Sequence, residues 1–103
     1  MLNQLVLVGR LVDKPTVEEM EDGRKVSYIK VAVLRNYKNA DGEYLTDVIP
    51  ITLYNGIAEN TESYCNKGDL IGFKGRVEEN EENIILVAEK ITFLSSKSEK
   101  EEE

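Results

Sequence analysis

The 103-residue chain alternates apolar and polar positions with the two-residue period of β-strands along most of its length. Apolar side chains fall on both faces of residues 2–12, which predicts a first strand that is buried between layers or in a subunit interface. Further strands are predicted at residues 17–20, 25–34, 47–54, 69–77 and 83–94. The pattern therefore indicates an all-β protein.

Turn-forming residues separate these strands. The pair Asp22-Gly23 is a strong hairpin signal, and residues 39–43 form a second turn-rich segment. Gly9, inside the first strand, predicts a bulge or a sharp bend. Pro50 cannot donate a hydrogen bond to a sheet ladder, so we expect it at an edge or at a bulge.

A short helix is predicted at residues 56–66. Ile57, Thr61 and Tyr64 follow one another at helical spacing, so we expect Tyr64 in the core with Ile57. Residues 67–68, Lys-Gly, provide a C-terminal stop. Five main strands, a helix between the third and the fourth, and an early bend glycine match the OB-fold, a small barrel that binds oligonucleotides or oligosaccharides.

Composition narrows the possible functions. Hydrophobic residues make up 41% of the chain, which is enough for one core, and we assign one domain to residues 1–94. From residue 95 onward the chain is Ser, Lys and Glu, and we expect a disordered acidic tail at residues 95–103. Because the chain has no histidine, histidine-based catalysis, Ser-His-Asp triads and histidine-ligated zinc are excluded.

Cys65 is the one cysteine of the chain, so an internal disulfide and a Cys-x-x-Cys site are excluded as well. We expect Cys65 to be a small buried group in a protein of a reducing compartment. The N-terminus has no leader pattern, and no apolar run is long enough for a membrane span. These features favour a cytoplasmic protein with no membrane association, no metal, no cofactor and no catalytic activity.

The net charge of −7 opposes nucleic-acid binding, because contacts to phosphate need Lys and Arg. The charge is unevenly distributed, however. The first fifty residues carry seven basic and eight acidic groups, whereas the remaining residues carry six and twelve. The N-terminal half can therefore still present a local basic surface.

Three segments resemble bacterial single-stranded DNA-binding proteins. Residues 2–11 (LNQLVLVGRL) resemble the opening strand of that family, and residues 67–77 (KGDLIGFKGRV) and 87–94 (VAEKITFL) are similar to its fourth and fifth strands. Residues 41–43 and 58–60 fall in register between them. The resemblance implies a five-stranded OB-fold barrel with a short helix between strands 3 and 4. It also implies single-stranded DNA as the ligand and a homo-oligomer, a tetramer or dimer, assembled through the first strand.

The resemblance also implies a set of binding residues. In such proteins, bases stack on aromatic rings while Lys and Arg follow the phosphates. Tyr37 stands where the family has a stacking aromatic before the second turn, and Tyr54 matches another at the end of the third strand. The basic residues expected to contact phosphate are Arg10, Lys30, Arg35, Lys38, Lys74 and Arg76. We expect Tyr28, which shares a strand face with Lys30, to be ordinary barrel surface.

Other positions depart from the family pattern. Val48 stands where the family usually has Trp or Phe, and Pro50 where it has a polar or basic group. The connection at residues 78–82 is short and carries four glutamates, in place of a long basic and aromatic hairpin. Two interpretations therefore stay open. The chain is a single-stranded DNA-binding protein of DNA replication, recombination or repair that works with the proteins of those processes, or an OB-fold interaction or structural module with weak or lost DNA binding.

Overall fold

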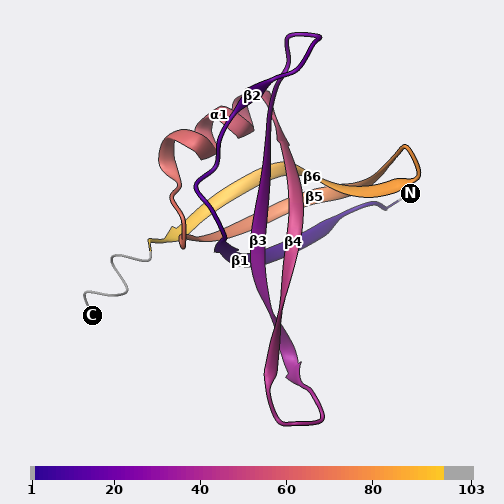
Figure 1. Ribbon diagram of the computed structural model, residues 1–103, viewed down its shortest axis with the longest axis vertical. Helices are drawn as coiled ribbons and strands as arrows, with labels where there is room; N and C mark the ends of the chain where they lie inside the picture. Colours follow the sequence, from indigo (N-terminus) through magenta and orange to yellow (C-terminus); the bar gives the residue numbers. More distant parts are fainter. Residues whose placement is uncertain (1, 97–103) are drawn as a thin grey trace.

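The computed structural model describes residues 2–96, in which the chain forms six strands and one helix (Figure 1). These elements are β1 (Leu5–Leu11), β2 (Glu18–Glu19), β3 (Lys25–Lys38), β4 (Tyr44–Tyr54), α1 (Asn55–Tyr64), β5 (Leu70–Asn80) and β6 (Asn83–Ser95). The five main strands and the helix between the third and fourth of them are confirmed, and β2 is a two-residue segment paired with β3. Ser95 belongs to β6, and residues 97–103 of the expected tail lie outside the described residues.

The sheet closes into a barrel. Its strand order is β1-β5-β6-β4-β3-β2, and β1 also pairs with β3. The β4–β6 contact is parallel, at Thr52 and Val87, and the remaining pairs are antiparallel. A closed five-stranded barrel with this helix position is the expected OB-fold.

Gly9 allows β1 to change partners. Residues 5–10 of the strand pair with β5, and Arg10 and Leu11 also pair with β3. A Cβ atom at Gly9 would lie 2.4 Å from the carbonyl oxygen of Ala32, so a side chain there would collide with the β3 backbone. Glycine is therefore needed because two backbones approach closely. The strand keeps an unbroken register with β5 through Gly9, and the expected bend stays a prediction.

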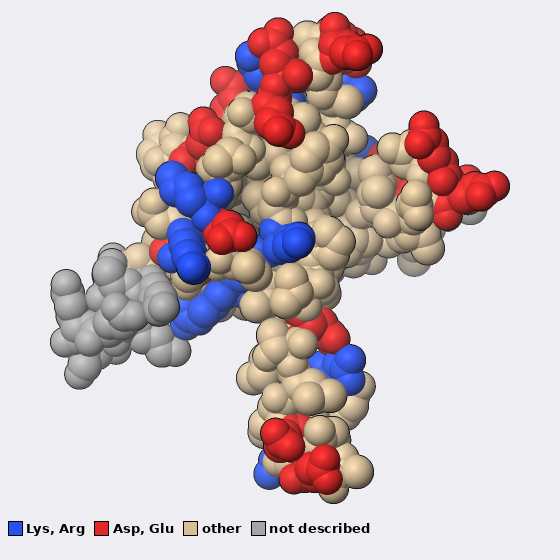
Figure 2. All heavy atoms as spheres, in the orientation of Figure 1, with Lys and Arg blue, Asp and Glu red and all other residues tan. Residues whose placement is uncertain are grey.

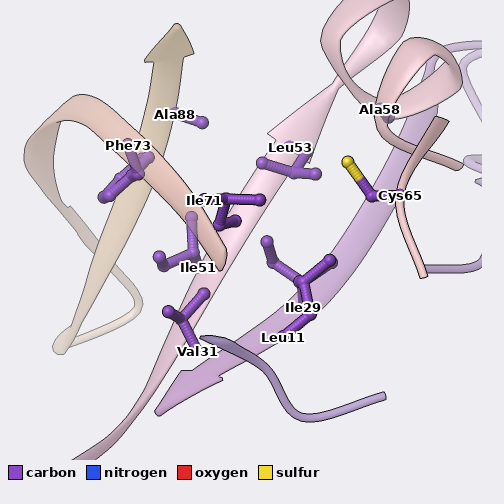
Figure 3. Packing of buried hydrophobic residues seen from close by; sticks show 10 residues of the cluster. All are labelled: Leu11, Ile29, Val31, Ile51, Leu53, Ala58, Cys65, Ile71, Phe73 and Ala88. Carbon is purple, nitrogen blue, oxygen red and sulfur yellow. The ribbon is translucent and has the colours of Figure 1, made fainter. Parts of the chain in front are cut away.

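The core fills the barrel between β3 and β4 on one side and β5 and β6 on the other, with α1 at one end (Figure 3). The buried cluster contains Leu11, Ile29, Val31, Ile51, Leu53, Ala58, Cys65, Ile71, Phe73 and Ala88. Cys65 is buried as predicted, and this burial raises the pKa of its thiol. The core thus collects the inward positions of the barrel strands and one face of the helix.

The prediction for Tyr64 is wrong, because its side chain is 76% exposed. The helix ends at Tyr64, two residues earlier than predicted, so this side chain stands on the last turn. Ala58 and Thr61 are the residues of α1 that are buried instead.

The first strand is also less buried than predicted. Val6 is 65% exposed and Val8 is 49% exposed, so β1 does not lie between two layers of this chain. The other alternative for this strand, burial in a subunit interface, stays a prediction.

Pro50 was expected at an edge or at a bulge, but it lies in β4, between β3 and β6 in the sheet, two residues before the β4–β6 pair of Thr52 and Val87. Its partner in β3 is Lys30, whose carbonyl oxygen accepts a hydrogen bond from the backbone N–H of Val12. Lys30 therefore directs its backbone groups toward β1, and the pair with Pro50 is a non-hydrogen-bonded one. The nitrogen of Pro50 consequently faces the edge of β4 away from β3, where no ladder hydrogen bond is lost.

The strands extend beyond the barrel as three arms (Figure 1). The longest is the β3–β4 arm, in which the strands reach Lys38 and Tyr44, four and three residues past the predicted ends. The predicted turn at residues 39–43 is confirmed, and the backbone N–H of Asn39 closes it by donating to the carbonyl oxygen of Glu43. The other arms end in the β2–β3 turn at residues 20–24 and the β5–β6 turn at residues 81–82.

The β5–β6 turn holds two glutamates in the left-handed region, Glu81 at φ 51° and Glu82 at φ 69°. Two-residue turns of this kind favour Asn-Gly, because other residues are strained at positive φ. The double substitution Glu81→Asn/Glu82→Gly is expected to raise the free energy of unfolding by about 1–2 kcal/mol, measured by urea denaturation. Glu81→Gln/Glu82→Gln is the control, since it removes the charges and keeps the strain. An equal gain in the control would show that charge repulsion, not backbone strain, limits stability there.

Candidate nucleic-acid interface

Alternate residues of β3 and β4 point away from the core and form one surface. Directly paired residues of neighbouring strands share a face of the sheet. Tyr28 pairs with Thr52, and Lys30 pairs with Pro50. The β3–β4 outer face, from the barrel toward the tip of the arm, comprises Tyr54, Tyr28, Lys30, Pro50, Val48 and Leu34. This surface is largely apolar and exposed, with one ammonium group near its middle.

Two tyrosines lie side by side at the barrel end of this face. Tyr54, the last residue of β4, is half-buried, and the guanidinium of Arg24 lies 5.2 Å from its ring centre. Tyr28 is 65% exposed and sits opposite Thr52, two residues from Tyr54. Diagonal neighbours of this kind have Cβ atoms about 7 Å apart. Tyr28, which we expected to be ordinary barrel surface, is thus a neighbour of Tyr54, the predicted stacking residue. The alternation of Tyr28 with the inward-facing Ile29 in the sequence indicated that its ring points outward.

Tyr37 lies far from Tyr54. Tyr54 is in register with Val26, and Tyr37 comes eleven residues later in β3. At about 3.3 Å per residue, this separation is up to about 36 Å. Tyr37 is 60% exposed near the tip of the arm, where Lys38 Nζ lies 5.6 Å from the ring centre of Tyr44. The structure therefore does not bring the two predicted stacking rings together.

Two of the arginines that were predicted to contact phosphate form ion pairs with carboxylates of this chain. Arg35 donates two hydrogen bonds of 2.9 Å to Asp47, which raise the pKa of Arg35 and hold the pKa of Asp47 below its usual value. Arg76 Nε donates to Glu78 over 2.6 Å, and Arg76 Nη1 lies 3.6 Å from Glu89. A phosphate at either arginine must share the guanidinium with a carboxylate or displace it.

The other predicted basic residues differ in their surroundings. Among residues 2–96, neither Lys30 nor Lys74 makes an ion pair, so both ammonium groups can take a phosphate without competition. Lys38 faces the ring of Tyr44 and forms no ion pair within residues 2–96. Arg10 lies on β1 and donates to the carbonyl oxygen of Gly68 over 2.9 Å. Of these four, Lys30 and Lys38 belong to β3, while Arg10 and Lys74 lie elsewhere on the barrel.

Acidic side chains are concentrated at the free ends of the three arms (Figure 2). They are Glu21 and Asp22, Asp41 and Glu43, and Glu79, Glu81 and Glu82, all exposed. Asp22 accepts hydrogen bonds from the backbone and guanidinium of Arg24, which lower its pKa and keep it ionised. The arm ends therefore repel phosphate, and the most favourable place for a nucleic-acid backbone is the middle of the β3–β4 outer face.

A solvent-open hollow of about 660 Å³ borders Tyr28. Its lining includes Met20 and Val26, together with Glu18, Glu19, Glu21 and Asp22. Lys25 and Arg24 pair with two of these acids, at 3.0 Å and 2.8 Å. The hollow thus has room for a planar base beside Tyr28, while its acidic rim opposes a phosphate there.

Residues 2–84 match the model of the Single-strand binding protein family. The chain belongs to this family. Single-stranded DNA-binding protein B of Bacillus subtilis is 39% identical over 106 residues, which cover 94% of each chain. Single-stranded DNA-binding protein 1 of Clostridium acetobutylicum is 33% identical over 95% of this chain and 98% of its own. Single-stranded DNA-binding protein 1 of Staphylococcus aureus is 37% identical over 95% of this chain and 69% of its own.

A solved structure confirms the architecture. A deletion mutant of the single-stranded DNA binding protein from Thermus aquaticus superposes with a TM-score of 0.74 at 23% identity. The match covers 94% of this chain and 52% of that one, and it shows the OB-fold. The resemblance drawn from the sequence is confirmed, and with it a place among non-catalytic proteins that bind single-stranded DNA. No helix among residues 2–96 is long and apolar enough to cross a membrane.

Proposed function

We propose that this chain binds single-stranded DNA along the β3–β4 outer face, in DNA replication, recombination or repair. Bases stack on Tyr54 and Tyr28 at the barrel end. Tyr37, which lies against Arg35 near the tip of the arm, offers a further ring where the strand continues beyond this face. Phosphates contact Lys30 between these ends and Lys38 beside Tyr37. The observation that carries the proposal is the exposed ring of Tyr28 next to Tyr54. The ammonium of Lys30, which forms no ion pair within the described residues 2–96, lies on the same face.

The energetics favour stacking over charge in this chain. One base–aromatic stack is worth roughly 1–3 kcal/mol and needs no particular sequence, because every base has a π-face. Arg35 and Arg76 add less than free arginines, since carboxylates already occupy them. Val48 and Leu34 supply apolar contact without a ring. Arg10 and Lys74 contact phosphate only where the strand continues around the barrel.

We further propose that two or more copies associate through β1. Residues 5–9 of β1 pair with β5 along one edge, and β3 covers the other edge only at Arg10 and Leu11 in the described part of the chain. An open strand edge is a template for a second chain. The exposed Val6 and Val8 lie on the same segment and add an apolar contact. A dimer or tetramer built in this way accounts for the apolar positions on both faces of the strand.

The test is a titration of the purified protein with oligo-dT at several salt concentrations, beside a mass measurement in solution. The chain has five tyrosines and no tryptophan, so stacking is expected to quench tyrosine fluorescence. We expect log K to fall with log salt by roughly 0.7 for each phosphate contacted. A mass of one chain at the titration concentration would remove the self-association proposal alone.

A second function is favoured by a specific observation. The acidic arm ends and the carboxylate-bound arginines suit an OB-fold module that binds other proteins and has weak or lost DNA binding. The same titration separates the two. If oligo-dT causes no quenching even in dilute buffer, DNA binding is wrong for this chain and the interaction module is supported.

A further inference from the structure

Asn55 and Gly56 connect the end of β4 to the first turn of α1, and they are the single Asn-Gly pair of the chain. Both residues are exposed. The backbone nitrogen that follows an asparagine can attack the side-chain amide carbon and close a cyclic imide. Glycine hinders this attack less than any other residue, because it has no Cβ atom. The surroundings of the pair then decide whether the folded chain reacts.

The attacking nitrogen, that of Gly56, is not engaged elsewhere in the fold. The first N–H groups of a helix have no intrahelical acceptor, and α1 begins without a side-chain cap. Within residues 2–96, the backbone N–H of Gly56 donates no hydrogen bond. No atom lies within 4 Å of the position that a Cβ atom at Gly56 would occupy. Water or buffer can therefore remove the proton that this nitrogen must lose.

The amide that is attacked, that of Asn55, is held by a backbone donor. Its Oδ1 accepts a hydrogen bond of 3.2 Å from the backbone N–H of Lys25 in β3. During the attack this oxygen gains negative charge, and a preorganised N–H directed at such an oxygen stabilises the transition state. The N-terminus of α1 adds partial positive charge at the same place. The fold thus combines a free nucleophile with an activated amide.

We propose that Asn55 is a deamidation site, at which the folded chain slowly converts a neutral amide into a carboxylate. The backbone nitrogen of Gly56 bonds to Cγ of Asn55, the Cγ–Nδ2 bond breaks, and ammonia leaves with the proton of that nitrogen. One water molecule then opens the cyclic imide. Opening at Cγ gives aspartate with the backbone restored, whereas opening at the backbone carbonyl gives isoaspartate, in which the backbone runs through Cγ. Either product carries one additional negative charge.

The new charge lies at the barrel end of the β3–β4 outer face. Residue 55 directly follows Tyr54, over whose ring the guanidinium of Arg24 lies. The modification does not depend on DNA, but its consequence rests on the proposed function, because an added carboxylate repels phosphate. Asn55→Asp carries the charge of the product and keeps an acceptor for the N–H of Lys25. We expect it to bind oligo-dT up to about fivefold more weakly in dilute buffer and to approach the parent as salt is added.

Ageing of the purified protein tests the proposal. The folded parent is incubated at 37 °C, digested at mildly acidic pH, and analysed by mass spectrometry with fragmentation that distinguishes isoaspartate from aspartate. We expect Asn55 to lose its amide faster than the other asparagines, and faster at pH 8.5 than at pH 6.5, because base removes the proton of the attacking nitrogen. Asn60 is the internal control, since it is also exposed on α1 but precedes the branched Thr61, whose N–H is bound within the helix. Equal loss at Asn55 and Asn60 would overturn the proposal.

Gly56→Ala is the matched variant. Its Cβ atom meets open space and alanine favours a helix, so the fold is expected to be at least as stable. The variant keeps Asn55 and its bond to Lys25, and it is expected to lose the amide of Asn55 no faster than that of Asn60. Undiminished loss in this variant would contradict attack by the nitrogen of residue 56.

A comparison of the folded parent with the parent in concentrated urea shows what the fold contributes. If Asn55 keeps its amide in the folded chain and loses it only in urea, the fold protects the pair and the proposal is wrong. None of these mass measurements uses DNA. If the parent binds no oligo-dT, the proposed function is lost together with the expected effect on affinity, while deamidation of Asn55 is still decided by the ageing experiment.

Discussion

Replacement of Gly75 by alanine is expected to lower the free energy of unfolding by about 3 kcal/mol, the upper end of the usual cost of overpacking. A Cβ atom at this position would lie 2.1 Å from the carbonyl oxygen of Val87 and 2.8 Å from Cζ of Phe73. The first contact is with the backbone of the neighbouring strand, and the second is with the largest fully buried side chain. Neither can move without disturbing the β5–β6 ladder, whose register shifts between Lys74 and Gly75, so the cost is large.

Gly72 provides the matched control for this substitution. It lies on the same strand, but the nearest atoms to an added Cβ are 3.7–3.9 Å away, which is ordinary contact. Gly72→Ala is therefore expected to change the free energy of unfolding by no more than about 0.5 kcal/mol. Urea denaturation of both variants, followed by circular dichroism, measures the difference. Equal losses would mean that alanine is poorly tolerated along β5 in general, and that the close approach at Gly75 is not the cause.

The largest effect on binding is expected from the paired tyrosines. Tyr28→Ala and Tyr54→Ala should each weaken oligo-dT binding by about 1–3 kcal/mol, the value of one base–aromatic stack. This is roughly a 5- to 150-fold loss of affinity. Because Tyr28 is 65% exposed, its substitution is expected to leave the fold intact, so its effect reports on binding directly.

Two variants make this prediction specific. Tyr28→Phe keeps the ring and is expected to bind like the parent. Tyr64→Ala removes a tyrosine that is more exposed than Tyr28 and lies on α1 beside β6, off the β3–β4 outer face, and it is expected to have no effect on affinity. Affinity is measured by anisotropy of a labelled oligo-dT, so that lost tyrosines do not distort the signal. If Tyr28→Ala binds as tightly as Tyr64→Ala, the β3–β4 outer face is not the stacking surface.

The separation of Tyr37 from Tyr54 changes how the candidate site is understood. The resemblance to the family placed a stacking ring at each position, but their distance depends on the length of the β3–β4 arm. That length follows from pairing between residues 44–46 and the end of β3, which local alternation did not reveal because the predicted strands ended at residues 34 and 47. The arginines show the same limit, since Arg35 meets Asp47 only across the folded hairpin.

Local patterns were enough for the outline of the fold. The two-residue alternation around Ile29 and Ile51 predicted the inward positions of β3 and β4, and both residues are buried. The chemistry of single residues also marked Gly9 as a special position of β1, and the close approach of the β3 backbone is the reason. The prediction that Tyr64 lies in the core was wrong, because helical spacing shows which residues share a face of the helix and does not show where the helix leaves the barrel.

By itself, the sequence determined the strands, the helix between the third and fourth of them, the turns and the family of the chain. These features depend on neighbours within a few residues or on motifs read along the chain. Only the tertiary structure decided that Tyr28 stands beside Tyr54, that carboxylates hold Arg35 and Arg76, and that the backbone N–H of Lys25 meets the side chain of Asn55. These placements depend on strand register, which is set by packing between residues distant in the sequence and is not encoded in local periodicity.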